Sequence, residues 1–355
     1  MMTTTGLSQP ISITVLTGFL GAGKTTFLAK LLKHQDMRRT AVIINEFGEV
    51  GLDHLFIETM EEDTIVELQN GCVCCTIRGD LRRALTSLAK RMDDGELPLI
   101  GQIVLETTGL ADPVPIIHTL MTTRDLGLRF KLDGIITIVD ATNGRNTLFV
   151  HEEAERQAAM ADRIIISKRD LASADEVRSL EVRLRELNPG MEIVEADEAV
   201  RNLNLVIGLG TYDPGTKGRD VPAWLKFENY AAQDHHHHHD VNRHDSEIQA
   251  FSLVHETPIE PMALAYFIQQ LTGIAGPNLL RLKGVVNLRG ETRPAVIHAV
   301  QHVCSPIEWL DDWPDADHRT RIVFITRSIS HFEIEARFKF LMELADTASA
   351  LSGTA

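Results

Sequence analysis

The chain has 355 residues, 44% of them hydrophobic, and a formal net charge of −15. This length suffices for roughly two domains with separate cores. The acidic balance argues against general attraction to nucleic acid or to an anionic membrane surface. The sequence shows neither a signal peptide nor an apolar run of about 18 residues, which predicts a cytoplasmic protein without a membrane segment.

The first predicted strand, residues 11–17, runs into the stretch TGFLGAGKTT. Gly18, four further residues, and then Gly23, Lys24 and Thr25 match the P-loop pattern in the strand-to-helix context that it requires. Glycines let backbone N–H groups converge on a phosphate, the lysine adds a positive charge, and the threonine hydroxyl reaches Mg²⁺. The stretch predicts nucleoside triphosphate binding rather than a glycine-rich turn without a ligand.

A second predicted strand, residues 40–45, leads into the acidic segment NEFGEVGLD. Glu46, Glu49 and Asp53 stand around two glycines in this segment. It is either a solvated acidic loop or a switch segment whose carboxylates can bind Mg²⁺ or a second metal ion.

Three of the four cysteines, Cys72, Cys74 and Cys75, lie within four positions of one another. A disulfide between the adjacent Cys74 and Cys75 would be severely strained, and Cys304, expected in a packed core, cannot supply a framework of bridges. Chance clustering in a core stays open, because buried cysteine packs as a small hydrophobic residue. We favour a thiolate metal site of open metal identity, because a sharp backbone turn, which Gly71 permits, would let the side chains of C-x-C-C converge on one ion. A helix predicted to begin near Thr76 would place its positive end beside the thiols and favour thiolates.

The strand predicted at residues 102–107 delivers Glu106 and then Gly109. A carboxylate at that strand end can hold Mg²⁺ through water, and the glycine N–H can sense the terminal phosphate. A strand that simply ends in a polar turn is the alternative.

Two later strands, predicted at residues 134–141 and 163–167, are almost continuously apolar, as strands buried on both faces of a parallel sheet are. The second is followed by a sequence close to the guanine-reading pattern Asn-Lys-x-Asp, with Ser167, Lys168 and Asp170 at its positions. Asp170 would accept hydrogen bonds from the guanine base. Lysine and aspartate after a strand are common, but behind a P-loop they favour guanine recognition.

The alternation of strands and helices over residues 1–210 predicts an α/β P-loop domain with a mainly parallel sheet flanked by helices. Residues 211–247, rich in polar and turn-forming residues, are predicted to be a linker, and residues 248–355 a smaller α+β domain. The linker contains a run of five histidines, His235, His236, His237, His238 and His239. The run either collects Zn²⁺, Co²⁺ or Ni²⁺ loosely or is merely solvated.

In this combination the sequence resembles the CobW-type family of P-loop GTPases, which includes cobalamin-synthesis proteins and zinc chaperones. The resemblance rests on GFLGAGKTT, NEFGEVGLD, NGCVCC and ETTGLADP in this order, and it extends to LLRLKGVVNL, the region of Trp309 and Trp313, and RIVFITR. It implies a metal motif of three cysteines, Cys72, Cys74 and Cys75, with Glu49 as the carboxylate ligand. The predicted nucleotide-binding set is Gly18, Gly21, Ala22, Gly23, Lys24, Thr25, Thr26, Gly109, Ser167, Lys168 and Asp170.

The leading interpretation is a GTPase that couples GTP binding and hydrolysis to delivery of Zn²⁺ to a client metalloprotein. Lys24, Thr25 and Glu106 are its predicted catalytic residues, with Thr25 and Glu106 at Mg²⁺. The alternatives are a factor that loads cobalt or another metal in cobalamin synthesis or into a metalloenzyme, a small-molecule P-loop kinase, and a non-catalytic binding module. Phosphate release without an acceptor separates the GTPase from the kinase.

Overall fold

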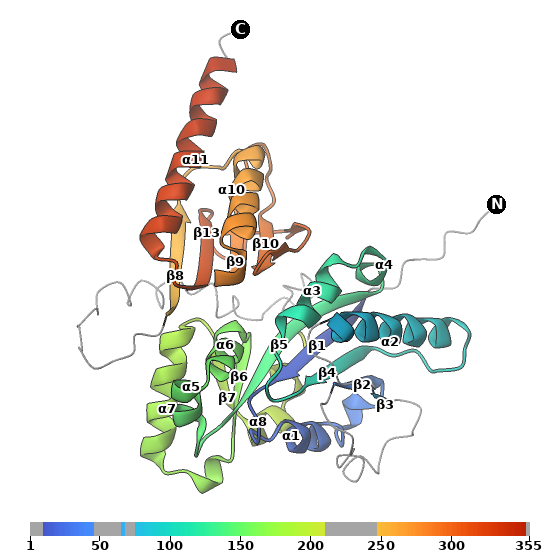
Figure 1. The fold of residues 1–355 in the computed structure, drawn as a ribbon. Coiled ribbons are helices and arrows are strands. Elements are labelled where there is room, and N and C mark those ends of the chain that lie inside the picture. Colours follow the sequence, from blue (N-terminus) through green and yellow to red (C-terminus); the bar gives the residue numbers. More distant parts are fainter. Residues whose placement is uncertain (1–9, 46–64, 68–74, 210–246, 353–355) are drawn as a thin grey trace, which may run out of the picture. The chain divides into compact units, whose positions relative to one another are not determined.

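The computed structural model describes residues 10–45, 65–67, 75–209 and 247–352 (Figure 1). They pack into two compact units, one around each of two sheets. In the part of the chain that is described, no helix combines the length and the apolar character needed to cross a bilayer.

Strands and helices alternate along the chain from residue 11 to residue 201. The strands are β1 (Ile11–Thr17), β2 (Thr40–Asn45), β3 (Ile65–Glu67), β4 (Gln102–Thr107), β5 (Phe130–Asp140), β6 (Arg163–Ser167) and β7 (Glu192–Glu195). The helices are α1 (Lys24–Leu31), α2 (Cys75–Asp93), α3 (Val114–Thr122), α4 (Arg124–Gly127), α5 (Gly144–Val150), α6 (Glu152–Met160), α7 (Ala174–Leu187) and α8 (Ala196–Arg201).

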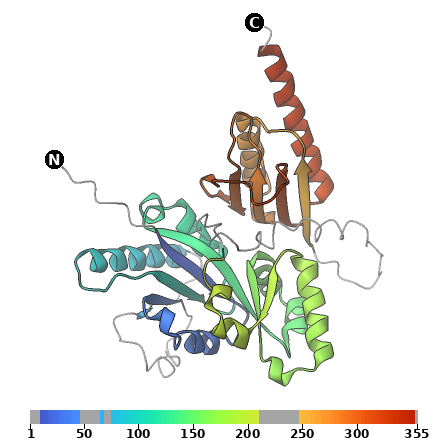
Figure 2. The ribbon, with the colours of Figure 1, turned by 180° about the vertical axis from the view of Figure 1, so that it is seen from behind.

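The seven strands form one sheet in the order β3-β2-β4-β1-β5-β6-β7. The pairs from β3 to β6 are parallel, and their register aligns Glu106 of β4 with Leu16 of β1 and with Ile44 of β2. The loops that follow these strands therefore leave the sheet at one edge. Figures 1 and 2 show helices on both faces, with α2 and α3 together on one and α1 and α8 on the other.

Apolar side chains explain these layers. Phe27, Leu28 and Leu31 of α1 are buried in one cluster with residues of β1, β2, β4 and β5. Leu81 and Leu85 of α2 are fully buried, as their spacing predicts. These two helices thus cover the sheet with the apolar faces that their sequences provide.

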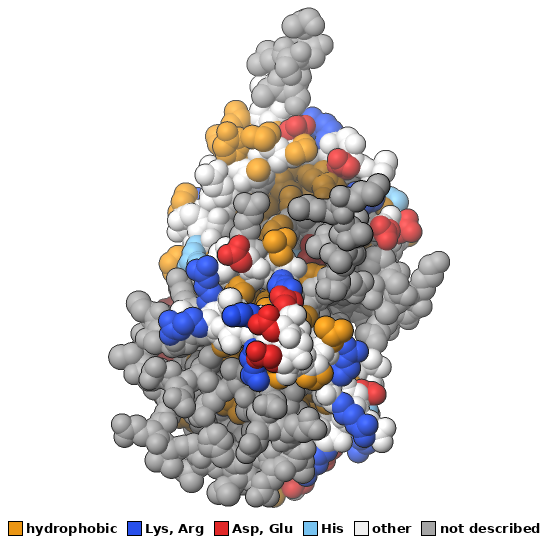
Figure 3. All heavy atoms as spheres, turned by 90° about the vertical axis from the view of Figure 1, so that its right-hand side faces the viewer, with side chains coloured by type: hydrophobic (Ala, Val, Ile, Leu, Met, Phe, Trp, Pro, Cys, Tyr) orange, Lys and Arg blue, Asp and Glu red, His pale blue; other side chains and the backbone are white. Residues whose placement is uncertain are grey.

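Ion pairs lie on the exposed outer surface of these layers. Arg129, just before β5, donates to both carboxylate oxygens of Asp93 at the end of α2, over 2.7 and 2.6 Å. Figure 3 shows one side on which acidic and basic side chains of the described residues lie intermingled. Exposed pairs of this kind contribute little to stability.

The second unit is built on an antiparallel sheet. Its strands are β8 (Ile248–His255), β9 (Leu279–Val286), β10 (Ala295–Val300), β11 (Val303–Cys304), β12 (Glu308–Trp309) and β13 (Thr320–Arg327). They run in the order β11-β10-β9-β13-β8, and β12 pairs with β10. Two helices, α10 (Pro261–Ile274) and α11 (His331–Ser352), pack together and against this sheet.

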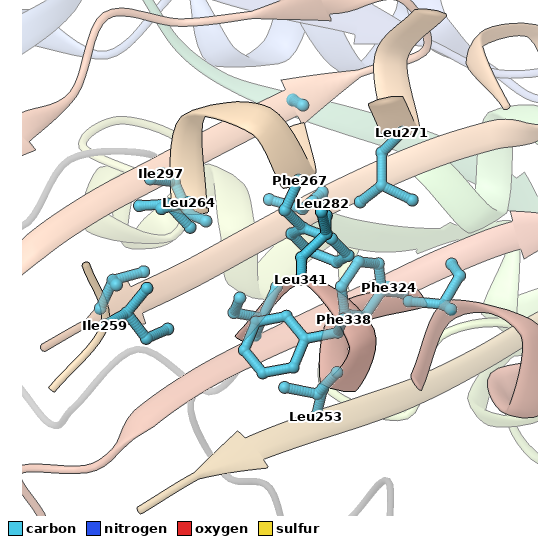
Figure 4. Packing of buried hydrophobic residues seen from close by; sticks show 14 of the residues in the cluster. Leu253, Ile259, Leu264, Phe267, Leu271, Leu282, Ile297, Phe324, Phe338 and Leu341 are labelled. Atoms are coloured by element: carbon cyan, nitrogen blue, oxygen red, sulfur yellow. The ribbon is translucent and has the colours of Figure 1, made fainter. Parts of the chain in front are cut away.

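The core of this unit is aromatic. The ring of Phe267 from α10 meets Phe338 from α11 edge-on at 5.0 Å and Phe324 from β13 at 6.4 Å, as Figure 4 shows from close by. Phe251 of β8 stacks on Phe324 at 5.4 Å. Cys304 lies half-buried against the same core, and burial raises the pKa of its thiol, as expected of a packed residue.

The predicted fold class is confirmed: a mainly parallel α/β sheet with a P-loop and a separate α+β unit. β1, β2, β4 and β6 have the predicted bounds, whereas β5 begins at Phe130 rather than at residue 134. α2 begins at Cys75, close to the predicted start.

Candidate nucleotide and metal site

The phosphate loop connects β1 to α1. Gly18, Gly21 and Gly23 all have positive φ, and at Gly18 (φ +143°) an added Cβ would lie 2.4 Å from the carbonyl oxygen of Ile138. Only glycine fits this conformation and this approach to β5. Sterics therefore explain why the first position of the P-loop pattern, Gly18, is glycine.

Helix α1 presents its positive end to the loop. It begins at Lys24 behind Gly23, which provides no side-chain cap. The first N–H groups of a helix have no partner within the helix, and together with the helix dipole they make a site for an anion such as phosphate. Thr26, in the first turn, is exposed.

Lys24 lies inside the loop. Its side chain is 8% exposed, and Nζ donates to the carbonyl oxygen of Gly18 over 2.9 Å and to that of Phe19 over 3.3 Å. A buried ammonium held by carbonyl groups can add a phosphate oxygen as a further partner. The predicted lysine is thus in place to neutralise phosphate charge.

Thr25 and Glu106, the two predicted Mg²⁺ ligands, lie in contact. The Thr25 hydroxyl donates to Oε1 of Glu106 over 2.8 Å, although the residues are 81 positions apart in the chain. Glu106 is buried at the end of β4. A hydroxyl and a carboxylate are hard oxygen ligands of the kind that Mg²⁺ prefers, so this pair fits that ion.

Gly109, the predicted phosphate sensor, lies against the phosphate loop. A Cβ at this position would come within 2.6 Å of the backbone nitrogen of Leu20. The approach is possible only for glycine, and it sets the loop that follows β4 directly beside the P-loop backbone.

The residues of the guanine-reading pattern are tied to the same loop. The Ser167 hydroxyl donates to the carbonyl oxygen of Ala22 over 2.6 Å, and Nζ of Lys168 donates to that of Gly21 over 2.7 Å. Asp170 is exposed in a short 3₁₀ turn that follows. Serine therefore bonds the phosphate loop directly from the position that asparagine holds in the usual pattern.

Asp140, at the end of β5, was not among the predicted site residues. Its Oδ2 accepts from Nζ of Lys168 over 2.5 Å. Burial alone would raise the pKa of Asp140, but hydrogen bonds from Lys168, Thr142 and Asn143 outweigh it and lower the pKa to about 2. Asp140 is therefore ionised and holds Lys168 across the phosphate loop. A carboxylate at the carboxyl end of a buried parallel strand was the available signal.

A cavity of about 220 Å³ opens beside the phosphate loop. Its walls come from the loop, from the end of β5 and from α5 and α6, and include Phe19, Asp140 and Gln157. Phe19 also stacks on His151, which precedes α6, with ring centroids 4.5 Å apart. The part of the cavity wall that Phe19 forms is thus packed against the start of α6.

The predicted transition-metal site lies almost wholly outside the described residues. Cys72, Cys74, Glu49 and the histidines at residues 235–239 belong to segments that the structure does not describe, as do Glu46 and Asp53. Cys75 is the first residue of α2, whose positive end therefore lies at the cysteine motif, as expected. The described residues alone contain no cluster of three or more histidine, cysteine, aspartate or glutamate side chains.

Two family models match the chain. Residues 12–195 match the CobW/HypB/UreG nucleotide-binding domain, and residues 248–341 match the cobalamin synthesis protein CobW C-terminal domain.

Individual relatives agree with the family models. The zinc chaperone YjiA of Escherichia coli is 32% identical over 93% of this chain and 98% of its own length. The zinc chaperone CobW of Sinorhizobium sp. is 32% identical over 84% of this chain and 88% of its own. The crystal structure of Zn(II)-bound YjiA GTPase from E. coli superposes with a TM-score of 0.68 at 27% identity, covering 94% of this chain and 99% of that one.

Proposed function

The chain belongs to the CobW/HypB/UreG family, and from that premise we propose that it is a cytoplasmic GTPase and metallochaperone. It couples GTP binding and hydrolysis to the delivery of Zn²⁺ to a client protein. The observation that carries the nucleotide half is the convergence of Lys24, the Thr25–Glu106 pair and the Ser167–Lys168 loop on one phosphate loop.

Each group has a defined task in hydrolysis. Lys24 neutralises charge on the phosphoryl oxygens, and Thr25 and Glu106 are the residues that would hold Mg²⁺. Mg²⁺, when bound, supplies positive charge to the terminal phosphates. Gly109 offers its N–H to the γ-phosphate, so the loop after β4 distinguishes GTP from GDP.

The base is read at the opposite end of the phosphate loop. Asp170 accepts from the guanine N–H groups, while the Lys168 ammonium, fixed by Gly21 and Asp140, keeps the reading loop in register. These contacts favour GTP over ATP, since adenine presents no matching pair of donors.

Zinc is the cargo that the cysteine motif favours. Cys72, Cys74 and Cys75 supply three sulfur ligands and Glu49 a fourth, oxygen ligand, which suits tetrahedral Zn²⁺. The positive end of α2 at Cys75 favours ionised thiols. The histidines at residues 235–239 collect further metal ions loosely.

The proposal is tested by titrating Zn²⁺ and GTP, each with and without the other, on the full chain at fixed pH. We expect each ligand to change the affinity of the other by the same factor, about 5- to 150-fold. Cys74→Ser should remove most of that factor and leave GTP binding without metal intact, because a serine hydroxyl is a poor zinc ligand. Equal affinities in all combinations would contradict a metallochaperone switch.

The same preparation decides between the remaining alternatives. Metal content of protein purified without a tag, with turnover compared in Zn²⁺, Co²⁺ and Ni²⁺, identifies the cargo. Phosphate release from GTP without any acceptor excludes a kinase, whereas intact GTP and metal binding without turnover would favour a binding module.

A further inference from the structure

Gln157 of α6 is a buried amide that bonds the loop after β4. Its side chain is 1% exposed, and Nε2 donates to the carbonyl oxygen of Ala111 over 3.0 Å and to that of Gly109 over 3.3 Å. The main-chain carbonyl oxygen of Gln157 accepts from the Thr137 hydroxyl of β5 over 2.7 Å, which fixes this turn of α6 against the sheet. Both N–H groups of the amide are therefore committed to the loop that carries the phosphate sensor.

The orientation of this amide is determined by its partners. Rotating it would set Oε1 against two carbonyl oxygens, all of them acceptors. In the observed orientation Oε1 is buried and has no hydrogen-bond partner among the described residues. An unpaired buried acceptor costs free energy, so an apolar side chain of equal size would serve packing better. The donated N–H groups are what glutamine contributes here.

Arg156, the residue before Gln157, forms a second contact between α6 and this loop. Nη1 of Arg156 donates to Oδ2 of Asp112 over 3.0 Å, and Oδ1 of Asp112 accepts from the N–H of Val114 at the start of α3. The loop from Gly109 to Asp112 is thus held at both ends by one helix.

From this geometry we infer that Gln157 is a positioning residue for GTP hydrolysis. By bonding the carbonyl groups of Gly109 and Ala111, it fixes the Gly109–Leu110 and Ala111–Asp112 peptide planes. This limits rotation about the backbone of Gly109, whose N–H belongs to the preceding peptide unit, and so keeps that N–H directed at the γ-phosphate. Gly109 already lies against Leu20 of the phosphate loop, so a small rotation would remove that contact. The inference rests on the proposed GTPase function and adds a residue to it.

The test compares Gln157→Glu and Gln157→Met in the full chain, with Glu153→Gln, an exposed change on the same helix, as the matched control. Glutamate keeps the shape but presents acceptors to two carbonyl oxygens, so kcat should fall about tenfold or more near pH 8. Towards about pH 5.5 a protonated carboxyl can donate one of the two bonds, so part of kcat should return relative to wild type. Gln157→Met should show the loss without that recovery.

Nucleotide binding separates positioning from a structural role. GDP makes no γ-phosphate contact, so its affinity should stay within about twofold of wild type. The affinity for a non-hydrolysable GTP analogue should fall together with kcat. Equal losses for GDP and the analogue, or an unchanged kcat in both variants, would overturn the inference.

If Gln157→Glu does not fold, Gln157→Met supplies the same comparison. If the wild type binds both nucleotides but does not hydrolyse GTP, the proposed function fails, and the ratio of analogue to GDP affinity still tests Gln157.

Discussion

The phosphate loop and the aromatic core of the second unit are buried for different reasons. Around the loop the buried groups are polar: Lys24, Glu106 and Ser167 bond backbone or side-chain oxygens. In the second unit Phe267 and Phe338 lie in a cluster of apolar residues and meet edge-on, and Phe338 also meets the His255 ring at 5.3 Å. Burying polar groups costs free energy that apolar burial does not. The polar groups of the first region are thus buried at some expense of stability, whereas the apolar packing of the second contributes to stability.

The largest expected effect is on the aromatic core. Phe338→Ala removes a ring that is 2% exposed and should lower the free energy of unfolding by about 3–5 kcal/mol. Phe340→Ala, two residues along α11 and 65% exposed, is the matched control and should cost little. Chemical denaturation followed by tryptophan fluorescence measures both. A loss of GTP turnover in folded Phe338→Ala protein, with no loss of stability, would break the comparison.

The phosphate loop should show the opposite pattern. Lys24→Ala should reduce GTP turnover by about 10²–10³-fold, because the positive charge that stabilises the transferring phosphoryl group is lost. The unfolding free energy should change far less. Lys30→Ala on the same helix removes only an exposed pair with Asp197 and should leave turnover unchanged. Steady-state phosphate release is the readout, and full activity of folded Lys24→Ala protein would remove the P-loop from the mechanism.

A smaller effect is expected at the base-reading loop. Asp170→Asn should weaken the preference for GTP over xanthosine triphosphate by about 10- to 100-fold, since a neutral amide cannot accept from both guanine N–H groups. Asp175→Asn, an exposed change at the start of α7, is the control. Competition binding with GTP, ATP and xanthosine triphosphate gives the ratios, and an unaltered ratio would mean that Asp170 does not read the base.

The smallest expected effect is a dependence on acid. The folded-state pKa of Asp140 is about 2, below its ordinary 3.8, so its contribution to stability is complete above about pH 4 and is lost as pH falls towards 2. In wild type, this ionisation should make the free energy of unfolding at pH 5 larger than at pH 2.5 by on the order of 1 kcal/mol. Asp140→Asn should lack that difference. Urea denaturation of both proteins at the two pH values isolates this difference, and identical pH dependence would mean that the pair with Lys168 contributes nothing.

Local sequence pattern accounts for most of the fold and for part of the site. β1, β2, β4 and β6 are short continuous apolar runs, and such runs mark buried parallel strands well. β5 starts earlier than predicted because the mixed residues Phe130–Asp133 pair with β1 all the same. β3 has three residues, too few for a periodic signal.

The helices around the nucleotide loops were harder to foresee. α3 was not among the helices named from sequence, because Pro113 at its N-cap and Pro115 in its first turn are residues that often mark turns. α5 and α6 are short and separated at His151, so neither shows a long period.

Within the site, the P-loop was predictable because its pattern is contiguous. Asp140 and Gln157 were not, because each acts on groups far away in sequence: Gln157 bonds a carbonyl group 48 positions earlier. Such roles depend on which loops the sheet order brings to one edge, and no local pattern records that.

The bonds from Ser167 to Ala22 and from Lys168 to Gly21 join the proposed base-reading loop to the phosphate loop within the protein itself. Fixing a residue costs roughly 1–2 kcal/mol of backbone entropy, and here that cost is met during folding. A guanine nucleotide therefore meets a preorganised template and spends little of its binding energy on ordering these loops. Association on this side should be close to rigid docking, and the ordering entropy that separates GTP from GDP should arise at the loop that follows Glu106.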